Sequence, residues 1–202
     1  IFQPAEEQYP GGAKQMIKEG VLENPAVQKM FGQHVFPDLE VGKVGFCKGR
    51  YMASADEINI TITGKGGHAA IPESYKNPIS CAARLIVYLE DYFYAFRDLP
   101  SVFAIGFVEG NGYYNVISDK VILKGTFRTL NEEFRNSAHI KMQEIAKKIA
   151  KKYAFDIDFK IQKGYPSLYN NESLTEDAIR YAKEYLGENN VVNMPIRMTA
   201  ED

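Results

Sequence analysis

The protein has 202 residues, of which 45% are hydrophobic, 12% aromatic and 25% charged, with a formal net charge of −2, a composition that supports a packed core and argues against disorder. A pI near 6.0 argues against a nucleic-acid-binding face, and no apolar run approaches the roughly 18 residues of a membrane span. Cys47 and Cys81 are isolated, which excludes a disulfide framework and makes the reducing cytoplasm the expected compartment.

Residues 1 to 48 are expected to form part of an α/β domain. A short helix should follow Gly11-Gly12 and end before Gly20, because glycine readily takes the left-handed conformation beyond a helix end. Two short strands are expected at 30–36 and 41–46, where apolar residues are bounded by turn residues.

Residues 49 to 164 show a different pattern. Isoleucines alternate with polar residues over 57–63, which predicts a half-buried strand, and Asn77-Pro78 precedes an apolar stripe typical of a helix, formed by Ile79, Ala82, Ile86, Leu89 and Phe93. Further elements follow in chain order: a strand at 101–108, a turn at Asn111-Gly112, an extended segment at 116–130, a helix capped by Asn131 and a strand at 155–161. This order predicts a ferredoxin-like α+β domain, with two helices on one face of an antiparallel sheet.

Residues 165 to 202 are expected to complete the first domain. A helix between 174 and 185 ends at Gly187, and Val191-Val192 is expected to be a strand that returns to that domain, so the ferredoxin-like unit is inserted within it. Because the sequence starts at Ile1 without a methionine, we interpret it as an internal fragment, and the lack of a signal peptide is uninformative.

Two adjacent carboxylates and two histidines are the first candidates for chemistry. Neighbouring residues on an extended chain point in opposite directions, so Glu6 and Glu7 could serve two tasks, one holding a metal and the other moving a proton; the alternative is a solvated acidic pair. His34 lies in an apolar stretch, where a core histidine is the alternative to a ligand. His68 follows Gly64-Lys65-Gly66-Gly67 and is expected on an exposed loop tip.

Other residues carry weaker signals. Arg128 could anchor a substrate carboxylate through paired hydrogen bonds, although a strand arginine is usually solvated, and His139 is expected to be ordinary surface. Gly11-Gly12-Ala13-Lys14 lacks the first half of a phosphate-binding P-loop. Lys124-Gly125-Thr126-Phe127 begins like an RNA-recognition signature but departs from it at Thr126.

Taken together, these stretches resemble the metal-dependent amidohydrolases of the M20 metallopeptidase family, which includes aminoacylases, hippurate hydrolases and auxin-conjugate hydrolases. The matching stretches follow the family's order along the whole chain: Phe2-Gln3-Pro4-Ala5-Glu6-Glu7, Gly11-Gly12-Ala13-Lys14, Phe31-Gly32-Gln33-His34-Val35, Met52-Ala53-Ser54-Ala55-Asp56, residues 64 to 70, Asn115-Val116-Ile117, Gly125-Thr126-Phe127-Arg128 and Glu201-Asp202.

The resemblance implies hydrolysis of the amide bond of an N-acyl amino acid, a similar small amide or a dipeptide. It implies a catalytic domain, formed here by residues 1–48 and 165–202, that binds two divalent metal ions. These ions are zinc or manganese, with cobalt or nickel as further options. The resemblance also implies a lid domain, made by 49–164, through which a homodimer forms. Neither a nucleic acid nor a membrane is an expected partner.

Roles for single residues follow from the same resemblance. Glu6 is implied to be the general base, and Glu7 and His34 are implied to be metal ligands. His68 is implied to stabilise the tetrahedral intermediate, often in the site of a partner subunit. Asn115 and Arg128 are implied to bind the free carboxylate of the substrate. Glu201 is implied to lie near the metal site.

The chain also departs from the family pattern. The upstream segment with a bridging aspartate and the downstream histidine ligand are absent, so this chain alone is expected to be inactive. Ser118 stands where proline is frequent, and Glu73 stands where relatives often have histidine. The alternative function is a non-catalytic relative whose lid is a dimerisation or binding module, but the retained acidic and histidine residues favour an enzyme. An RNA-binding domain conflicts with the net charge.

Overall fold

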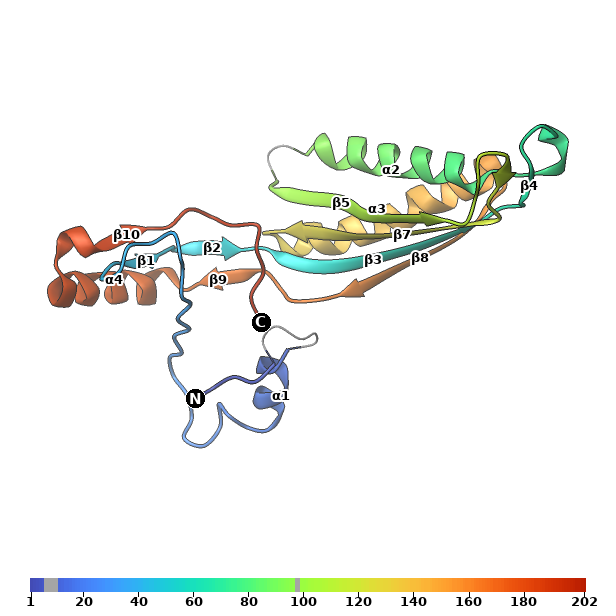
Figure 1. The fold of residues 1–202 in the computed structure, drawn as a ribbon. Coiled ribbons are helices and arrows are strands. Elements are labelled where there is room, and N and C mark those ends of the chain that lie inside the picture. Colours follow the sequence, from blue (N-terminus) through green and yellow to red (C-terminus); the bar gives the residue numbers. More distant parts are fainter. Residues whose placement is uncertain (6–10, 97–98) are drawn as a thin grey trace.

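The computed structural model describes residues 1–5, 11–96 and 99–202. Figure 1 shows an elongated molecule with a helix-covered sheet at one end and short strands with one helix at the other. The helices are α1 (Ala13–Lys18), α2 (Pro78–Tyr94), α3 (Glu132–Tyr153) and α4 (Glu172–Leu186), with 3-10 turns η1 (Pro72–Ser74) and η2 (Glu188–Asn190). The strands are β1 (Val44–Phe46), β2 (Gly49–Met52), β3 (Ser54–Thr63), β4 (Gly67–His68), β5 (Ser101–Gly110), β6 (Val116–Ile117), β7 (Lys120–Thr129), β8 (Asp156–Lys163), β9 (Leu168–Asn170) and β10 (Val191–Asn193).

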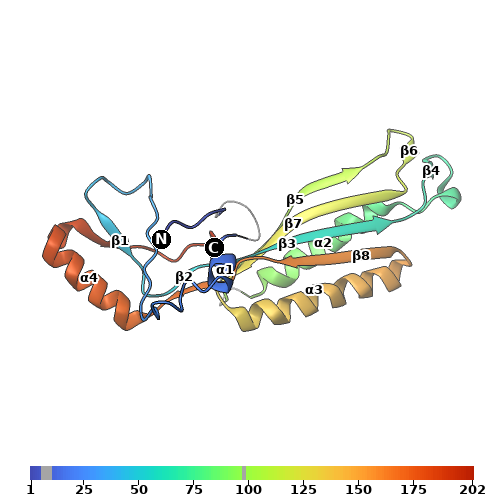
Figure 2. The same ribbon diagram turned by 90° about the horizontal axis from the view of Figure 1, so that it is seen from below.

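The four long strands form one antiparallel sheet in the order β5-β7-β3-β8. Helices α2 and α3 lie side by side on one of its faces (Figure 2). Along the chain the elements follow as β3, α2, β5, β7, α3 and β8, which is the order predicted between residues 57 and 162. The turn predicted at Asn111-Gly112 lies slightly later, because the chain reverses between Tyr113 and Val116.

The core lies between this sheet and its two helices. Ile58, Ile60 and Ile62 of β3 are at most 1% exposed, as their alternation predicts, and burial of each contributes about 1.5–3 kcal/mol. The helices bury one face each, formed by Cys81, Ala82, Leu85, Leu89 and Phe93 of α2 and by Ala138, Met142, Ile145, Ala146 and Ile149 of α3. The apolar stripe of α2 is therefore rotated from the predicted one, since Ile79 is 45% exposed.

Each long helix begins with an asparagine that satisfies one of its first backbone amides. The side chain of Asn77 accepts a hydrogen bond from the Ile79 amide, and the side chain of Asn131 accepts one from the Phe134 amide. Asn171 caps α4 in the same way. Such caps contribute about 1 kcal/mol each, and the first two fix the starts of the helices that cover the sheet.

The other end of the molecule is built from short paired strands. β1 pairs in parallel with β10, so residues 191–193 return to the first part of the chain as predicted. β2 pairs with β9, antiparallel. The strand predicted at 30–36 was wrong: this segment is irregular, because it has no strand partner among the described residues. Within the described ranges, no helix combines the length and apolar character needed to cross a membrane.

A buried ionic cluster lies where the sheet joins the rest of the chain. Asp56 is on the helix-facing side of β3, where alternation calls for an apolar residue, and it is 1% exposed. Arg135, also fully buried, donates from Nε (3.0 Å) and from Nη2 to the Asp56 carboxylate. The Gly164 amide (3.0 Å) and His139 Nε2 (2.6 Å) contact the same carboxylate. His139 is therefore not the ordinary surface residue that was expected, because its ring completes this cluster.

The cluster also holds the segment that connects β8 to β9. Arg135 donates from Nη1 to Glu132, and Glu132 accepts a hydrogen bond from the Ser167 amide (2.9 Å). Burial alone would raise the pKa of Asp56, but hydrogen bonds from His139, Arg135 and the Gly164 amide outweigh it and lower this pKa to about 2. The ionised carboxylate is therefore part of the folded state at neutral pH.

We expect Asp56→Asn to lower the free energy of unfolding by about 3–5 kcal/mol, because it leaves the buried Arg135 charge without its partner. The matched control is Asp158→Asn on β8, whose pair with Lys160 is exposed and which should change stability by less than about 1 kcal/mol. Urea unfolding of each chain measures both values. A loss below about 1 kcal/mol for Asp56→Asn would contradict the role given to the cluster.

The same chains test the pH dependence. The pKa of Asp56 in the folded chain lies below its ordinary value of 3.8, so its contribution to stability is present above that value and is lost as the pH falls toward 2. Stability of the unsubstituted chain should therefore decrease more steeply over this interval than stability of Asp56→Asn. If the stabilities of the two proteins fall equally steeply with pH over this interval, the lowered pKa of Asp56 would be contradicted.

Candidate functional site

The far end of the sheet forms a tip that carries two of the predicted site residues. β4 pairs with β6, placing His68 opposite Val116, and the Ala69 amide donates to the Asn115 carbonyl oxygen (2.9 Å). Gly67 is required here, because a Cβ at this position would lie 2.9 Å from side-chain atoms of Ser74 and Tyr75. The structure therefore brings His68 and Asn115 together on an exposed tip.

The ring of His68 is held by the turn that follows it. The Ile71 amide donates to the His68 carbonyl oxygen (2.9 Å), which closes a turn over residues 68–71. Within this turn, the Ala70 amide donates to Nδ1 of the His68 ring (3.1 Å). The imidazole is exposed but anchored at one nitrogen.

Arg128 lies at the opposite end of the same sheet. It pairs with Ala55 of β3, whereas Lys120, at the start of β7, pairs with the last residue of β3 beside the tip. At about 3.4 Å per residue, the eight steps from Lys120 to Arg128 span roughly 27 Å. One chain therefore does not bring Arg128 to His68 and Asn115. Instead, Arg128 Nη1 donates to the Met198 carbonyl oxygen (3.2 Å).

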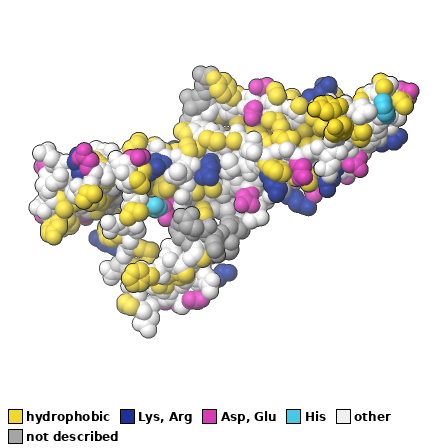
Figure 3. All heavy atoms as spheres, viewed as in Figure 1, with side chains coloured by type: hydrophobic (Ala, Val, Ile, Leu, Met, Phe, Trp, Pro, Cys, Tyr) yellow, Lys and Arg dark blue, Asp and Glu magenta, His cyan; other side chains and the backbone are white. Residues whose placement is uncertain are grey.

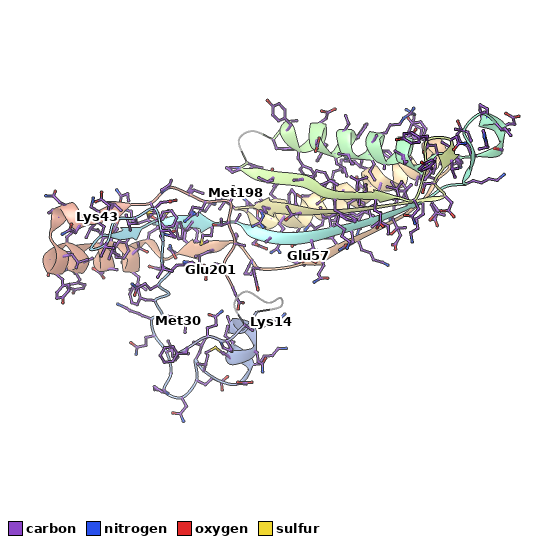
Figure 4. All side chains as sticks on the ribbon, in the orientation of Figure 1. Lys14, Met30, Lys43, Glu57, Met198 and Glu201 are labelled. Atoms are coloured by element: carbon purple, nitrogen blue, oxygen red, sulfur yellow. The ribbon has the colours of Figure 1, made fainter. Side chains whose placement is uncertain are left out.

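The C-terminal segment, which carries Glu201, crosses the junction between the two ends of the molecule (Figure 4). The Ala53 amide donates to the Thr199 carbonyl oxygen (2.9 Å), and the Arg197 amide donates to the Tyr51 carbonyl oxygen (2.8 Å). These bonds fix Glu201 on the Arg128 side of the molecule, far from the tip.

Asp202 links this segment to the N-terminal part of the chain. Its carboxylate accepts hydrogen bonds from the Gln3 side chain (2.6 Å) and from the Ala13 amide at the start of α1 (3.1 Å). Glu6 and Glu7, the predicted base and metal ligand, lie outside the described residues. Their roles stay predictions.

His34 is exposed on the irregular segment before β1. Its Nδ1 lies 2.6 Å from the Val35 carbonyl oxygen, and because a carbonyl can only accept, Nδ1 carries the ring proton. In the neutral ring the lone pair is then on Nε2, which is the arrangement common to metal-binding histidines. Among residues 1–5, 11–96 and 99–202, no three side chains of His, Cys, Asp or Glu are grouped to hold a metal ion.

The buried cluster of Asp56, Arg135 and His139 was missed from the sequence. Its signal was present, because Asp56 continues the helix-facing register of Ile58, and Arg135 lies three residues before the buried Ala138 of α3. An acid and a base that share buried faces of packed elements are candidates for an ion pair. The cluster positions the junction that bears Arg128, but it lies outside the predicted site.

Comparison with known proteins identifies the family. The profile of Peptidase family M20/M25/M40 matches residues 1–202. The chain belongs to this family. It is 35% identical over 190 residues to the N-acetyl-L-cysteine deacetylase of Bacillus subtilis, covering 91% of this chain and 44% of that protein. It is 38% identical over 193 residues to the hippurate hydrolase of Campylobacter jejuni, covering 94% of this chain and 50% of that protein.

Solved structures agree with the family assignment. The Bacillus subtilis YXEP protein, described as a dinuclear metal-binding peptidase of the M20 family, matches with a TM-score of 0.79 and 32% identity, over 100% of this chain and 50% of that one. The M20 chain therefore spans about half the length of the curated relatives it matches. The relatives include an amidohydrolase, a hippurate hydrolase and deacetylases.

Proposed function

We propose that the full-length protein is a metal-dependent amidohydrolase that cleaves N-acyl amino acids, similar small amides or dipeptides. The observation that carries this proposal is the family match over residues 1–202, which includes every residue whose role was inferred from the resemblance. An N-acetyl-L-cysteine deacetylase and a hippurate hydrolase are among the relatives, and both names describe an acyl group joined to an amino acid. With Cys47 and Cys81 both free thiols, the cytoplasm is the proposed compartment.

Glu7 and His34 are the residues of this chain that we assign to a pair of divalent metal ions. The donor chemistry fits, because His34 donates from Nδ1 to a carbonyl and keeps the Nε2 lone pair for a ligand bond. Carboxylate and imidazole suit zinc, manganese, cobalt and nickel. Bound there, the ions would polarise the amide carbonyl and activate water. Two metal ions need more ligands than these two residues supply, and we propose that other parts of the full-length protein provide them.

Side chains of the protein carry out the remaining steps of proton transfer, charge stabilisation and substrate binding. Glu6 takes a proton from the attacking water and passes it to the leaving amine, which is typically worth about 10²–10⁴-fold in rate. His68 donates a hydrogen bond to the oxygen on which negative charge develops. Asn115 and Arg128 hold the free carboxylate of the substrate. For this task the Arg128 guanidinium offers further N–H groups beyond the one on Nη1 that donates to the Met198 carbonyl oxygen.

We assign residues 49–164 to a ferredoxin-like lid and residues 1–48 and 165–202 to the catalytic domain. The four-stranded sheet with two helices on one face supports the lid assignment. The separation of roughly 27 Å along β7 supports a shared site, because a small substrate cannot reach His68 and Arg128 of the same lid. A homodimer solves this geometry, since each tip can supply His68 and Asn115 to the Arg128 and metal ligands of the partner.

The outer strand β5 is the edge that we propose pairs in this dimer. Phe107 and Val108 of β5 are 42% and 58% exposed, and Figure 3 shows hydrophobic side chains on this part of the surface. The opposite edge, β8, carries exposed Asp158 and Lys160, and charges on an edge strand discourage pairing. A second copy of the chain is therefore expected on the β5 side.

In the full-length protein, we expect Glu6→Gln to retain bound metal and to lower kcat by at least about 100-fold, because proton transfer is lost. Glu7→Gln should instead lower the metal content, because a ligand is lost. Metal analysis of the purified variants, with assays against a panel of N-acyl amino acids, separates the two. If the unsubstituted protein binds metal but cleaves no member of the panel, the non-catalytic alternative is favoured.

For the dimer, we expect Val108→Lys in the full-length protein to give monomers, because it places a charge on the pairing edge. Gln162→Lys on β8 is the matched control and should leave dimers intact. Sedimentation equilibrium reads both masses. Dimers that persist in Val108→Lys and dissociate in Gln162→Lys would place the interface on the other edge.

A further inference from the structure

The bond between the Ala70 amide and His68 specifies the chemical form of the ring. The two atoms are 3.1 Å apart, and the donor is an N–H that cannot accept. Nδ1 must therefore present a lone pair. In a neutral imidazole one nitrogen is a donor and the other an acceptor, so the proton is on Nε2.

The surroundings of the ring keep this arrangement in place. The turn from His68 to Ile71 is closed by its own backbone bond, and the Ala69 amide is tied to Asn115 across the β4–β6 pair. The Ala70 amide therefore has a fixed position relative to the His68 backbone, within reach of the ring. Nε2, the nitrogen farther from the backbone, has no hydrogen-bond partner among the described residues, and the side chain is exposed.

We propose that the Ala70 amide is a positioning group that holds His68 as the neutral Nε2–H form, so that the tip presents a hydrogen-bond donor and not a basic nitrogen. This inference rests on the proposed function and deepens it. A donor stabilises an oxygen that becomes negative in the transition state, whereas a lone pair at the same place repels it. The backbone thus sets the polarity of the ring before any substrate binds.

Nitrogen-15 NMR of the full-length protein, labelled at histidine, tests the form of the ring directly and does not depend on turnover. The His68 signals are identified by their loss in His68→Asn. We expect Nε2 to show the chemical shift of a protonated nitrogen and Nδ1 that of an unprotonated one. A proton on Nδ1, in the neutral ring or in the charged one at the pH of the assay, would overturn the proposal.

Two variants test whether the outward donor matters. The side-chain amide of Gln reaches the place of Nε2–H but cannot accept from the Ala70 amide in the same way. The Asn oxygen replaces Nδ1 as the acceptor and offers no donor at the outer position. We therefore expect His68→Gln to retain more kcat than His68→Asn, with Asn about 10²–10³-fold below the unsubstituted protein.

The relative kcat values of these two variants test whether the outward hydrogen-bond donor of His68 contributes to catalysis. If His68→Asn equals or exceeds His68→Gln in kcat, the outward donor is not what the tip supplies and the proposal fails. An unsubstituted protein that cleaves no tested substrate would instead refute the proposed function, and the NMR spectrum would still decide which nitrogen of the ring carries the proton.

Discussion

The fixed rise per residue of an extended strand determines how far apart the candidate site residues of this molecule lie. β7 is ten residues long and carries Arg128 near the end beside the C-terminal segment, while its other end leads to the tip that bears His68 and Asn115. A strand cannot shorten without losing its ladder of hydrogen bonds, so Lys120 and Arg128 of β7 stay roughly 27 Å apart within one chain, and His68 and Asn115 lie beyond the Lys120 end. If Arg128, His68 and Asn115 act on one substrate, they come from two chains.

The junction between the sheet and the rest of the chain carries Arg128, at the end of β7 that lies away from the tip. Asp56 and Arg135 supply a buried ion pair there, and Gly164 binds both members of it. Such a pair is weak evidence for net stability compared with a hydrophobic one. Instead, the four polar contacts of the Asp56 carboxylate and the fixed geometry of the pair specify where β8 leaves the sheet.

Much of the sheet was predictable because its signals are local. Alternating isoleucines place β3, and Asn77 and Asn131 mark helix starts through contacts with amides two or three residues away. Residues 30–36 failed as a strand because strand formation depends on a partner elsewhere in the chain. His139 was misjudged because its partner, Asp56, is 83 residues away in sequence. The likeness of short stretches to the M20 family indicated roles for His68 and Arg128. That these two residues lie at opposite ends of the sheet could be found only from the fold.

The measurement that tests the shared site most directly mixes two inactive full-length variants, Glu6→Gln and His68→Ala, under conditions in which subunits exchange. In a mixed dimer, one site combines Glu6 of one chain with His68 of the other, and the second site lacks both. With equal amounts and random exchange, half of the dimers are mixed, so about a quarter of the unsubstituted activity should return. No recovery, with exchange demonstrated by mass spectrometry of mixed dimers, would contradict a site built from two chains.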